Sequence, residues 1–167
     1  MLAGVTLNPA LKPISLHIGE PKHPTPAFIK KALADSLDGL ANYPTTLGGE
    51  ELRLAIAGWL KQRYGLAAID AQTEIIPVNG SREALFAFAQ TIIDPTRPDP
   101  LVVCPNPFYQ IYEGAALLAQ AQPRFLNQLP ANRYAFDLDE LPPETWQRTQ
   151  LIYVCSPGNP TGAVMSL

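Results

Sequence analysis

The fold is decided by a stretch near the end of the chain: Leu151–Cys155 (LIYVC), followed at once by Ser156–Gly162 (SPGNPTG). A continuous apolar run closed by proline, glycine and asparagine predicts a buried parallel strand that ends in a rigid loop. Ligands bind at such loops, at the carboxyl ends of strands in an open α/β sheet. We therefore expect a ligand-binding corner within Ser156–Gly162.

Upstream of this strand, apolar runs alternate with helical periodicities. Short strands are predicted at 75–78, 101–104 and 124–127, and helices at about 82–93 and 109–121. Pro77 restricts the first strand to an edge position or a strand end, because proline donates no ladder hydrogen bond. Strands spaced 23–27 residues apart with helices between them form βαβ units. The sequence therefore predicts an α/β fold, a mostly parallel sheet flanked by helices.

The first part of the chain carries two further helix patterns. After an extended arm over 1–24, Thr25 and Pro26 resemble a helix cap and first turn, and Gly39 can close that helix. A second helix is predicted over about 50–64, with Gly65 ending it. Its expected apolar face consists of Leu52, Ala55, Ile56, Trp59, Leu60 and Tyr64.

Composition and charge exclude several classes of function. The chain has 167 residues, is 47% hydrophobic and carries a formal net charge of −3, which leaves no electrostatic footprint for nucleic acid or an anionic membrane. No apolar stretch approaches the roughly 18 residues that a membrane span needs, and the amino terminus lacks the pattern of a signal peptide. Cys104 and Cys155 end predicted strands without metal-type spacing, which indicates two buried thiols in a reducing cytosol.

The segment Val78–Leu85 carries the first chemical motif. A strand turns through Gly80 into a helix start, with Ser81 near the cap. Free backbone N–H groups and the positive end of the helix dipole make such a turn a site for an anion, most plausibly phosphate. The alternative is an ordinary capped turn. The segment has neither a Walker pattern nor a GxGxxG pattern, which disfavours a nucleoside triphosphate or NAD.

Two further loops follow predicted strands. Cys104–Tyr112 holds two prolines and then aromatic residues, so Tyr109 could lie flat against a planar ligand, whereas Tyr112 is expected to be a core aromatic residue. Asn159 lies in the corresponding loop after the last strand, where its amide could donate to a ligand oxygen. An Asn-Pro pair by itself indicates only a turn.

Taken together, these segments resemble the amino-terminal part of a class I/II aminotransferase, a pyridoxal-phosphate enzyme of fold type I. The resemblance spans nearly the whole chain. Its motifs are Ile18–Pro21 with Thr25-Pro26, Tyr43-Pro44 with Gly48 and Leu52-Arg53, Asn79–Ser81, Pro107–Tyr109 with Tyr112, and Ser156–Gly162. It implies that residues 1–38 form an arm and first helix on the small-domain side, and that 39–167 form the first half of the cofactor-binding domain.

The resemblance implies roles for individual residues. The turn at Gly80, Ser81 and Arg82 would hold the phosphate of pyridoxal 5′-phosphate, Tyr109 would stack on its pyridine ring, and Asn159 would hydrogen-bond its phenolic oxygen. Gly19 would approach the α-carboxylate of the substrate. Tyr43 would reach the phosphate of the partner subunit in a homodimer.

Two arginines leave alternatives open. Position 82 is often a small polar residue in the family, so Arg82 could clamp the phosphate or turn away to pair with Glu83 or Asp94. We expect Arg53 on the second helix to be a structural ion-pair residue rather than a catalytic one. The family also implies cis peptide bonds before Pro107 and Pro160.

The chemistry of the family needs a lysine that carries the cofactor covalently. No lysine here has the expected context or position, since all precede the phosphate turn: Lys12, Lys22, Lys30, Lys31 and Lys61. We therefore expect no catalytic residue in this chain, which we take to be an inactive amino-terminal part of a longer enzyme. We also expect the isolated chain to fold poorly, because its first strand would have no neighbour in the sheet.

The implied activity of the whole enzyme is transfer of an amino group from an amino-acid donor to a 2-oxo acid acceptor. The amino-acid sequences of Asn79–Phe86 and Pro105–Tyr109 are similar to those of succinyldiaminopimelate aminotransferases of lysine biosynthesis. The alternatives are an aspartate- or alanine-type transaminase, a carbon–sulfur lyase and an inactive truncated gene product. A ligand sensor of a transcription regulator is less favoured, because such modules follow a DNA-binding region.

Overall fold

The computed structural model describes residues 8–12, 14 and 18–165, which form two compact units divided between Thr46 and Leu47. In the first unit, α1 (Ala27–Asp35) is followed by the 3₁₀ helix η1 (Leu37–Ala41). The predicted cap at Thr25 is wrong by one residue, since Pro26 is the N-cap and no side chain caps the helix. Helix α1 also ends earlier than predicted, where the Ser36 hydroxyl donates to the Ala32 carbonyl at 2.8 Å.

Helix α2 (Glu50–Tyr64) opens the second unit and confirms its predicted range. Gly65 ends it in the left-handed conformation (φ 65°) and donates its N–H to the Lys61 carbonyl. The predicted apolar face is wrong in part, because Leu52, Trp59 and Tyr64 are each more than half exposed. The helix instead packs through Ala57, with Ile56 and Leu60 beside it, on Ala71 and Ile75.

A three-stranded parallel sheet forms the centre of this unit: β1 (Leu101–Asn106), β2 (Gln122–Asn127) and β3 (Thr149–Ile152), in the order β2-β1-β3. Cys104 pairs with Phe125 on one side of β1, and Val103 pairs with Ile152 on the other. The parallel sheet is therefore confirmed. Strand β3 begins two residues before the predicted start at Leu151. Just after its end, the Tyr153 N–H donates to the Val103 carbonyl at 2.9 Å.

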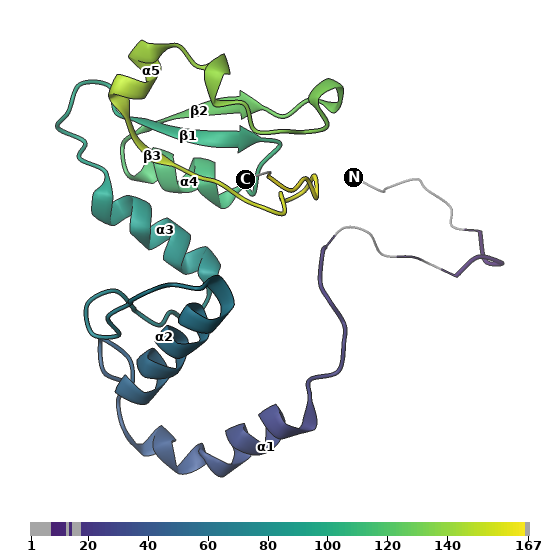
Figure 1. Ribbon diagram of the computed structural model, residues 1–167. Helices are drawn as coiled ribbons and strands as arrows, with labels where there is room; N and C mark the ends of the chain where they lie inside the picture. Colours follow the sequence, from purple (N-terminus) through teal and green to yellow (C-terminus); the bar gives the residue numbers. More distant parts are fainter. Residues whose placement is uncertain (1–7, 13, 15–17, 166–167) are drawn as a thin grey trace. The chain divides into compact units, whose positions relative to one another are not determined.

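Both faces of the sheet are covered, and the covering elements are α3 (Ser81–Ile92), α4 (Ile111–Leu118) and α5 (Pro143–Arg148). Figure 1 shows α4 and α5 on opposite sides of β1. Val102 and Cys104 pack on the side of α3 and α4, whereas Val103 packs with Leu126 and Trp146 on the side of α5. This alternation follows from the two-residue period of a strand.

The connections include pieces that the sequence patterns did not predict. Helix α5 and the 3₁₀ helices η2 (Pro130–Asn132) and η3 (Leu138–Glu140) lie between β2 and β3. Helix α4 is shorter than its predicted range of 109–121, because Gln120 takes a left-handed conformation (φ 61°) just after its end. None of these differences changes the order of strands and helices.

One predicted strand is wrong. Ile75–Val78 forms no strand and pairs with no strand of the described structure. The expectation that this segment lacks a neighbour in the sheet is therefore confirmed. Side-chain packing holds this segment in place. Ile75 is buried beside Ala57, and Pro77 lies against Gly48, where an added β-carbon would be 2.8 Å from the Pro77 Cγ atom. This segment leads directly into Gly80.

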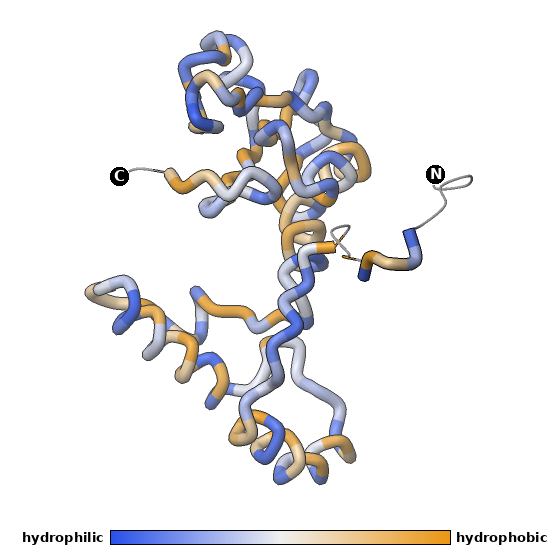
Figure 2. The backbone as a smooth tube through the Cα atoms, turned by 90° about the vertical axis from the view of Figure 1, so that its right-hand side faces the viewer, coloured by the Kyte–Doolittle hydropathy of each residue, from blue (hydrophilic) through white to orange (hydrophobic). Residues whose placement is uncertain are grey.

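Figure 2 shows apolar and hydrophilic residues alternating along the helices. Within the part of the chain that the structure describes, no helix combines the length and the apolar character that crossing a bilayer requires.

Candidate functional site

The turn at the start of α3 has the geometry of an anion site. Gly80 takes φ 140°, a conformation that side chains rarely adopt, and a β-carbon there would lie 2.6 Å from the Glu83 Oε2 atom. The first helical hydrogen bond runs from the Ala84 N–H to the Gly80 carbonyl, and no side chain caps the helix. The preceding N–H groups, including those of Ser81 and Arg82, therefore have no acceptor within the helix and attract an anion.

Arg82 lies beside this turn and is exposed. Among the described residues it forms no ion pair with Glu83 or Asp94, so the alternative in which it pairs with either of them is wrong. The Asp94 carboxylate instead accepts bonds from the Thr96 hydroxyl and N–H, which hold the pKa of Asp94 below its usual value. A role for Arg82 as a phosphate clamp stays a prediction.

Tyr109 follows β1. The Asn106–Pro107 peptide bond is cis, as predicted, and the ring of Tyr109 is half-buried. The rings of Tyr109 and Tyr112 pack edge to face, with centroids 6.0 Å apart and planes at 87°. Tyr109 therefore keeps part of its surface open at the carboxyl end of β1, which is compatible with stacking on a planar ligand.

Asn159 lies in the loop after β3 and is exposed. The Asn159–Pro160 bond is cis, as predicted, and the Ser156–Pro157 bond is also cis. The loop is closed by two short backbone bonds: Gly158 donates to the Ala163 carbonyl at 2.8 Å, and Gly162 donates to the Gly158 carbonyl at 2.7 Å. Because β1 and β3 are parallel neighbours, Tyr109 and Asn159 follow strands that end at the same edge of the sheet.

A chain of tyrosines joins these segments. Beyond its contact with Tyr109, Tyr112 stacks on Tyr153 with centroids 4.3 Å apart, and the Tyr153 hydroxyl donates to the Leu85 carbonyl of α3 at 2.8 Å. Tyr112 is 4% exposed, which confirms it as a core residue. The loop after β1, the end of β3 and the first turns of α3 are thus held in a fixed relation.

Sequence patterns did not single out Tyr153, although a tyrosine within an otherwise aliphatic strand could have been noticed. Desolvation raises the pKa of Tyr112 to about 12 and also raises that of Tyr153. Cys104, beneath them, is fully buried, and its pKa rises to about 12 for the same reason. These groups stay protonated at neutral pH and form a neutral interior under the site.

Two predicted site residues lie in the first unit. Gly19 is exposed, and a β-carbon built on it would meet nothing within 4 Å. Tyr43 is 99% exposed. Contacts of Gly19 with substrate and of Tyr43 with a partner subunit stay predictions.

Arg53 was predicted to form a structural ion pair, and it forms a hydrogen bond to a backbone carbonyl instead. It is 8% exposed, and its Nη1 donates to the Ala71 carbonyl at 3.0 Å. It forms no ion pair among the described residues, and its buried Nε has no partner. The predicted ion pair is therefore wrong, because a backbone carbonyl of the loop before Gly80 takes its place.

Comparison with models of protein families identifies the family of this chain. Residues 12–167 match the model of the family described as aminotransferase class I and II. The chain belongs to this family. Tyr109 follows β1 and Asn159 follows β3 of one parallel sheet, and the Gly80 turn begins α3, which packs on that sheet.

Relatives of known name support the assignment. The LL-diaminopimelate aminotransferase of Nitratidesulfovibrio vulgaris (strain Miyazaki F) is 37% identical over 152 residues, which is 90% of this chain and 38% of that protein. The enzyme of the same name from Aquifex aeolicus is 33% identical, over 92% of this chain and 39% of that protein. The chain thus spans about two fifths of the length of these relatives.

Solved structures agree. A crystal structure of an aminotransferase from Neisseria meningitidis is 50% identical with a TM-score of 0.89, over 98% of this chain and 41% of that one. The aminotransferase AspB of Helicobacter pylori is 36% identical with a TM-score of 0.80, over 89% of this chain and 38% of that one. The predicted α/β fold of an aminotransferase amino-terminal region is therefore confirmed.

Members of the family depend on pyridoxal 5′-phosphate. The residues present fit this group: the Gly80 turn offers unpartnered N–H groups for a phosphate, Tyr109 offers an open aromatic face, and Asn159 offers an exposed amide. All three lie on segments that the tyrosine chain or the parallel sheet ties together.

Proposed function

We propose that this chain supplies the phosphate- and ring-binding part of a pyridoxal-phosphate aminotransferase. The observation that carries the proposal is the turn at Gly80, where a glycine at φ 140° precedes a twelve-residue helix that no side chain caps. A phosphate is a dianion with several acceptor oxygens, and such a helix start offers both N–H donors and the positive end of the helix dipole.

Each residue has a separate task in this proposal. The backbone at Gly80–Arg82 donates to the phosphate and fixes the position of the group. Tyr109 covers one face of the ring, excludes water from it and sets its tilt. The Asn159 amide donates to the phenolic oxygen and so favours its ionised form. When bound, pyridoxal phosphate supplies an aldehyde that takes up the amino group and a ring that withdraws electrons.

The proposal extends to the whole protein. We expect an amino-acid donor, a 2-oxo acid acceptor and a homodimer in which Tyr43 contacts the phosphate of the partner subunit, with Gly19 near the substrate carboxylate. We also propose a cytoplasmic setting, which the two free thiols Cys104 and Cys155 support.

The proposed substrate is a diaminopimelate-type amino acid of lysine biosynthesis. The names of the relatives favour LL-diaminopimelate, whereas the amino-acid sequence of Asn79–Phe86 favours the succinylated form. Both substrates are amino acids with a second nitrogen and a second carboxylate. The far nitrogen is a cation in LL-diaminopimelate and an uncharged amide in the succinylated form, whose succinyl group also adds a third carboxylate.

Cofactor binding is tested on the whole protein that contains this chain, by titration with pyridoxal 5′-phosphate that is read from the absorbance and fluorescence of the cofactor. We expect saturable binding, at least tenfold weakening in Tyr109→Ala and little change in Tyr109→Phe, which keeps the aromatic face. Tyr64→Ala on α2 is the matched control, because Tyr64 is an exposed aromatic residue outside the site. Equal binding by the wild-type protein and Tyr109→Ala would contradict the placement of the ring.

The substrate is tested on the whole protein that contains this chain. Loss of the bound-cofactor spectrum is followed after addition of LL-diaminopimelate, its succinylated form, aspartate, alanine or a thioether amino acid. We expect the fastest change with one of the two diaminopimelate forms. A faster response to aspartate, alanine or the thioether would replace the proposed substrate with that of the corresponding enzyme.

A further inference from the structure

A cavity of about 420 Å³ lies where the segments after β2 and β3 meet. One wall is formed by Gln128 and Asn132–Phe136, and the other by Cys155 and Ala163–Met165. Its volume is within the range of small-molecule sites, about 300–1,000 Å³. None of the residues proposed above to hold the cofactor lines it, so the cavity needs its own explanation.

Of the described residues that line the cavity, Arg133 alone carries a charge. Among the described residues, Arg133 forms no ion pair. A guanidinium group offers a planar fork of donors that matches a carboxylate, and no acidic side chain of the lining competes for it. Tyr134, Phe136 and Met165 add aromatic and apolar surface around this cation.

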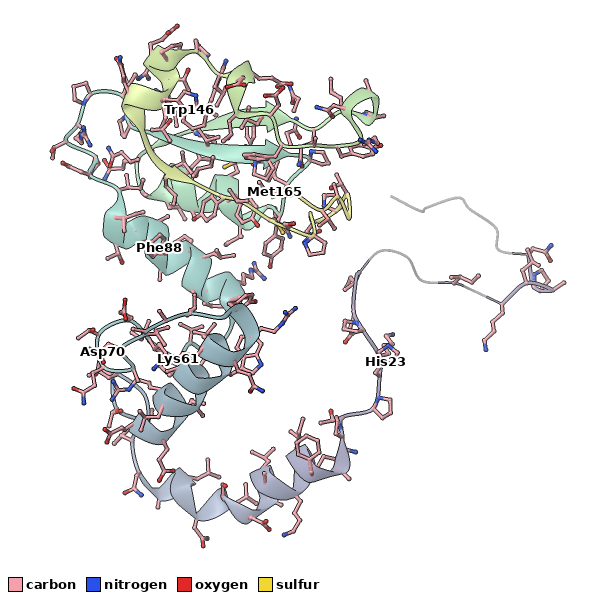
Figure 3. All side chains as sticks on the ribbon, in the orientation of Figure 1. His23, Lys61, Asp70, Phe88, Trp146 and Met165 are labelled. Atoms are coloured by element: carbon pink, nitrogen blue, oxygen red, sulfur yellow. The ribbon has the colours of Figure 1, made fainter. Side chains whose placement is uncertain are left out.

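A second cavity, of about 390 Å³ beside α2, differs in both respects. Its lining holds Lys61 and Arg53 but also Glu50 and Asp70, so neither sign of charge prevails; Figure 3 labels Lys61 and Asp70 there. The Nε atom of Arg53 is also closed off from solvent. An anion is therefore favoured only in the cavity at Arg133.

The wall that carries Arg133 is held by hydrogen bonds. The Tyr134 N–H donates to the Leu129 carbonyl at 2.9 Å, and the Gln128 side chain donates to the Tyr134 carbonyl at 3.0 Å. The Gln128 N–H in turn donates to the Asn106 carbonyl at the end of β1, at 2.7 Å. These bonds connect the loop to the central strand and reduce the ordering that a ligand would have to impose.

The same bonds maintain an uncommon backbone. Arg133 and Tyr134 both take left-handed conformations, with φ 56° and 60°. A residue other than glycine adopts this conformation at a cost in free energy, and it persists only where its surroundings enforce it. The two conformations place a cation and an aromatic residue next to each other on the cavity wall.

We propose that this cavity binds a small organic acid, with the Arg133 guanidinium on its carboxylate and with Tyr134, Phe136 and Met165 around its carbon chain. The site is separate from the cofactor-binding residues, and the proposal does not depend on cofactor binding. Succinate is the probe, because it presents a carboxylate on a short carbon chain that fits the cavity volume.

The chain provides its own reporter. Met165 lines the cavity and is labelled in Figure 3. In the whole protein that contains this chain, labelled with ¹³C-methyl methionine, the Met165 signal is assigned by its loss in Met165→Leu. Titration with succinate is expected to shift that signal in a saturable way. Succinamide, the uncharged analogue of the same size, is expected to cause no saturable shift.

Variants separate Arg133 from general charge effects. Arg133→Gln is expected to weaken succinate binding at least tenfold, and Arg133→Lys, which keeps the charge but loses the fork, to weaken it less. Arg124→Gln is the matched control, because Arg124 is an exposed arginine of β2 that does not line the cavity. The methyl spectrum without succinate shows whether each variant keeps the native fold.

Three results would overturn the proposal: an unchanged Met165 signal, a shift that sodium chloride reproduces at equal ionic strength, or equal affinity in wild type and Arg133→Gln. A Met165 shift that grows with protein concentration in the absence of succinate would assign the cavity to a carboxylate of a second copy instead. Failure of pyridoxal-phosphate binding with intact succinate binding would reject the proposed function and leave this site standing.

Discussion

Two apolar segments of this chain resemble strands in sequence, and only one becomes a strand. Leu101–Asn106 forms β1, pairs on both sides and has Val102, Val103 and Cys104 with no exposed surface. Ile75–Val78 has a similar composition but pairs with nothing in the described structure, and Ile76 is 63% exposed. The difference shows that an apolar run specifies burial, whereas a ladder needs a neighbouring strand.

The unpaired segment is nevertheless held in place. Ile75 packs against α2, and the Arg53 bond to the Ala71 carbonyl fixes the loop that precedes it. The Gly80 turn therefore depends on packing with α2, whereas Tyr109 and Asn159 depend on the sheet. The two parts of the proposed site rest on regions of different stability.

Hydrogen exchange gives the largest expected effect. The backbone N–H groups of Val102–Cys104 in the middle of β1 are expected to exchange at least on the order of 10³-fold more slowly than those of Ile75, Ile76 and Val78, because only the former are in ladder hydrogen bonds. Exchange followed by NMR measures both in one sample. Equal protection of the two segments would remove the distinction.

Deletion of side chains tests the same contrast by stability. Leu126→Ala, at a residue 2% exposed and packed on Val103, is expected to lower the free energy of unfolding by about 2–5 kcal/mol. Ile76→Ala, at an exposed residue, is expected to change it by no more than about 0.5 kcal/mol. Denaturant titration of the whole protein that contains this chain is the measurement. Equal losses of stability in the two variants would contradict the contrast between the buried and the exposed residue.

Glycine substitutions address the turn that follows the unpaired segment. Gly80→Ala is expected to cost about 1–3 kcal/mol, because φ 140° is strained for alanine and Glu83 must move from the new β-carbon. Gly58→Ala in α2, where a β-carbon would meet nothing, is expected to stabilise by about 0.5–1 kcal/mol. Thermal unfolding of both variants should show opposite signs, and a shift of the same sign would contradict the strain at Gly80.

The smallest expected effect is electrostatic. Asp70 accepts bonds from the Gln72 N–H and the Thr73 hydroxyl, which lower its pKa below the ordinary value of 3.8. A lowered pKa in the folded state adds stability that is present above pH 3.8 and lost as the pH falls through the folded value. Asp70→Asn should therefore be slightly less stable than wild type at neutral pH, with the difference shrinking in acid. A difference independent of pH would contradict the pKa shift.

The motifs of the proposed site are local, so the sequence was enough to locate them. The glycine at position 80 constrains the backbone by its own chemistry, and the turn there was predicted from it. The cis bonds at 106–107 and 159–160 were predicted only from the resemblance to the family, because an Asn-Pro pair by itself indicates a turn. The Tyr112–Tyr153 stack and the Tyr153 bond to Leu85 join residues far apart in the chain, and no local pattern encodes such contacts. The same reason explains why Arg53 was assigned an ion pair instead of a backbone carbonyl.

By itself, the sequence determined the alternation of strands and helices, the parallel sheet and the position of the glycine, tyrosine and asparagine that follow its elements. Periodicity and turn chemistry are properties of neighbouring residues, and they predicted a parallel strand before the loop at Ser156–Gly162, although β3 covers Thr149–Ile152 instead of Leu151–Cys155. Tertiary structure alone decided which apolar run entered the sheet, which face of α2 was buried and how Arg133 came to line a cavity. Those outcomes depend on which surfaces meet, and burial free energy is gained only where a partner surface is present.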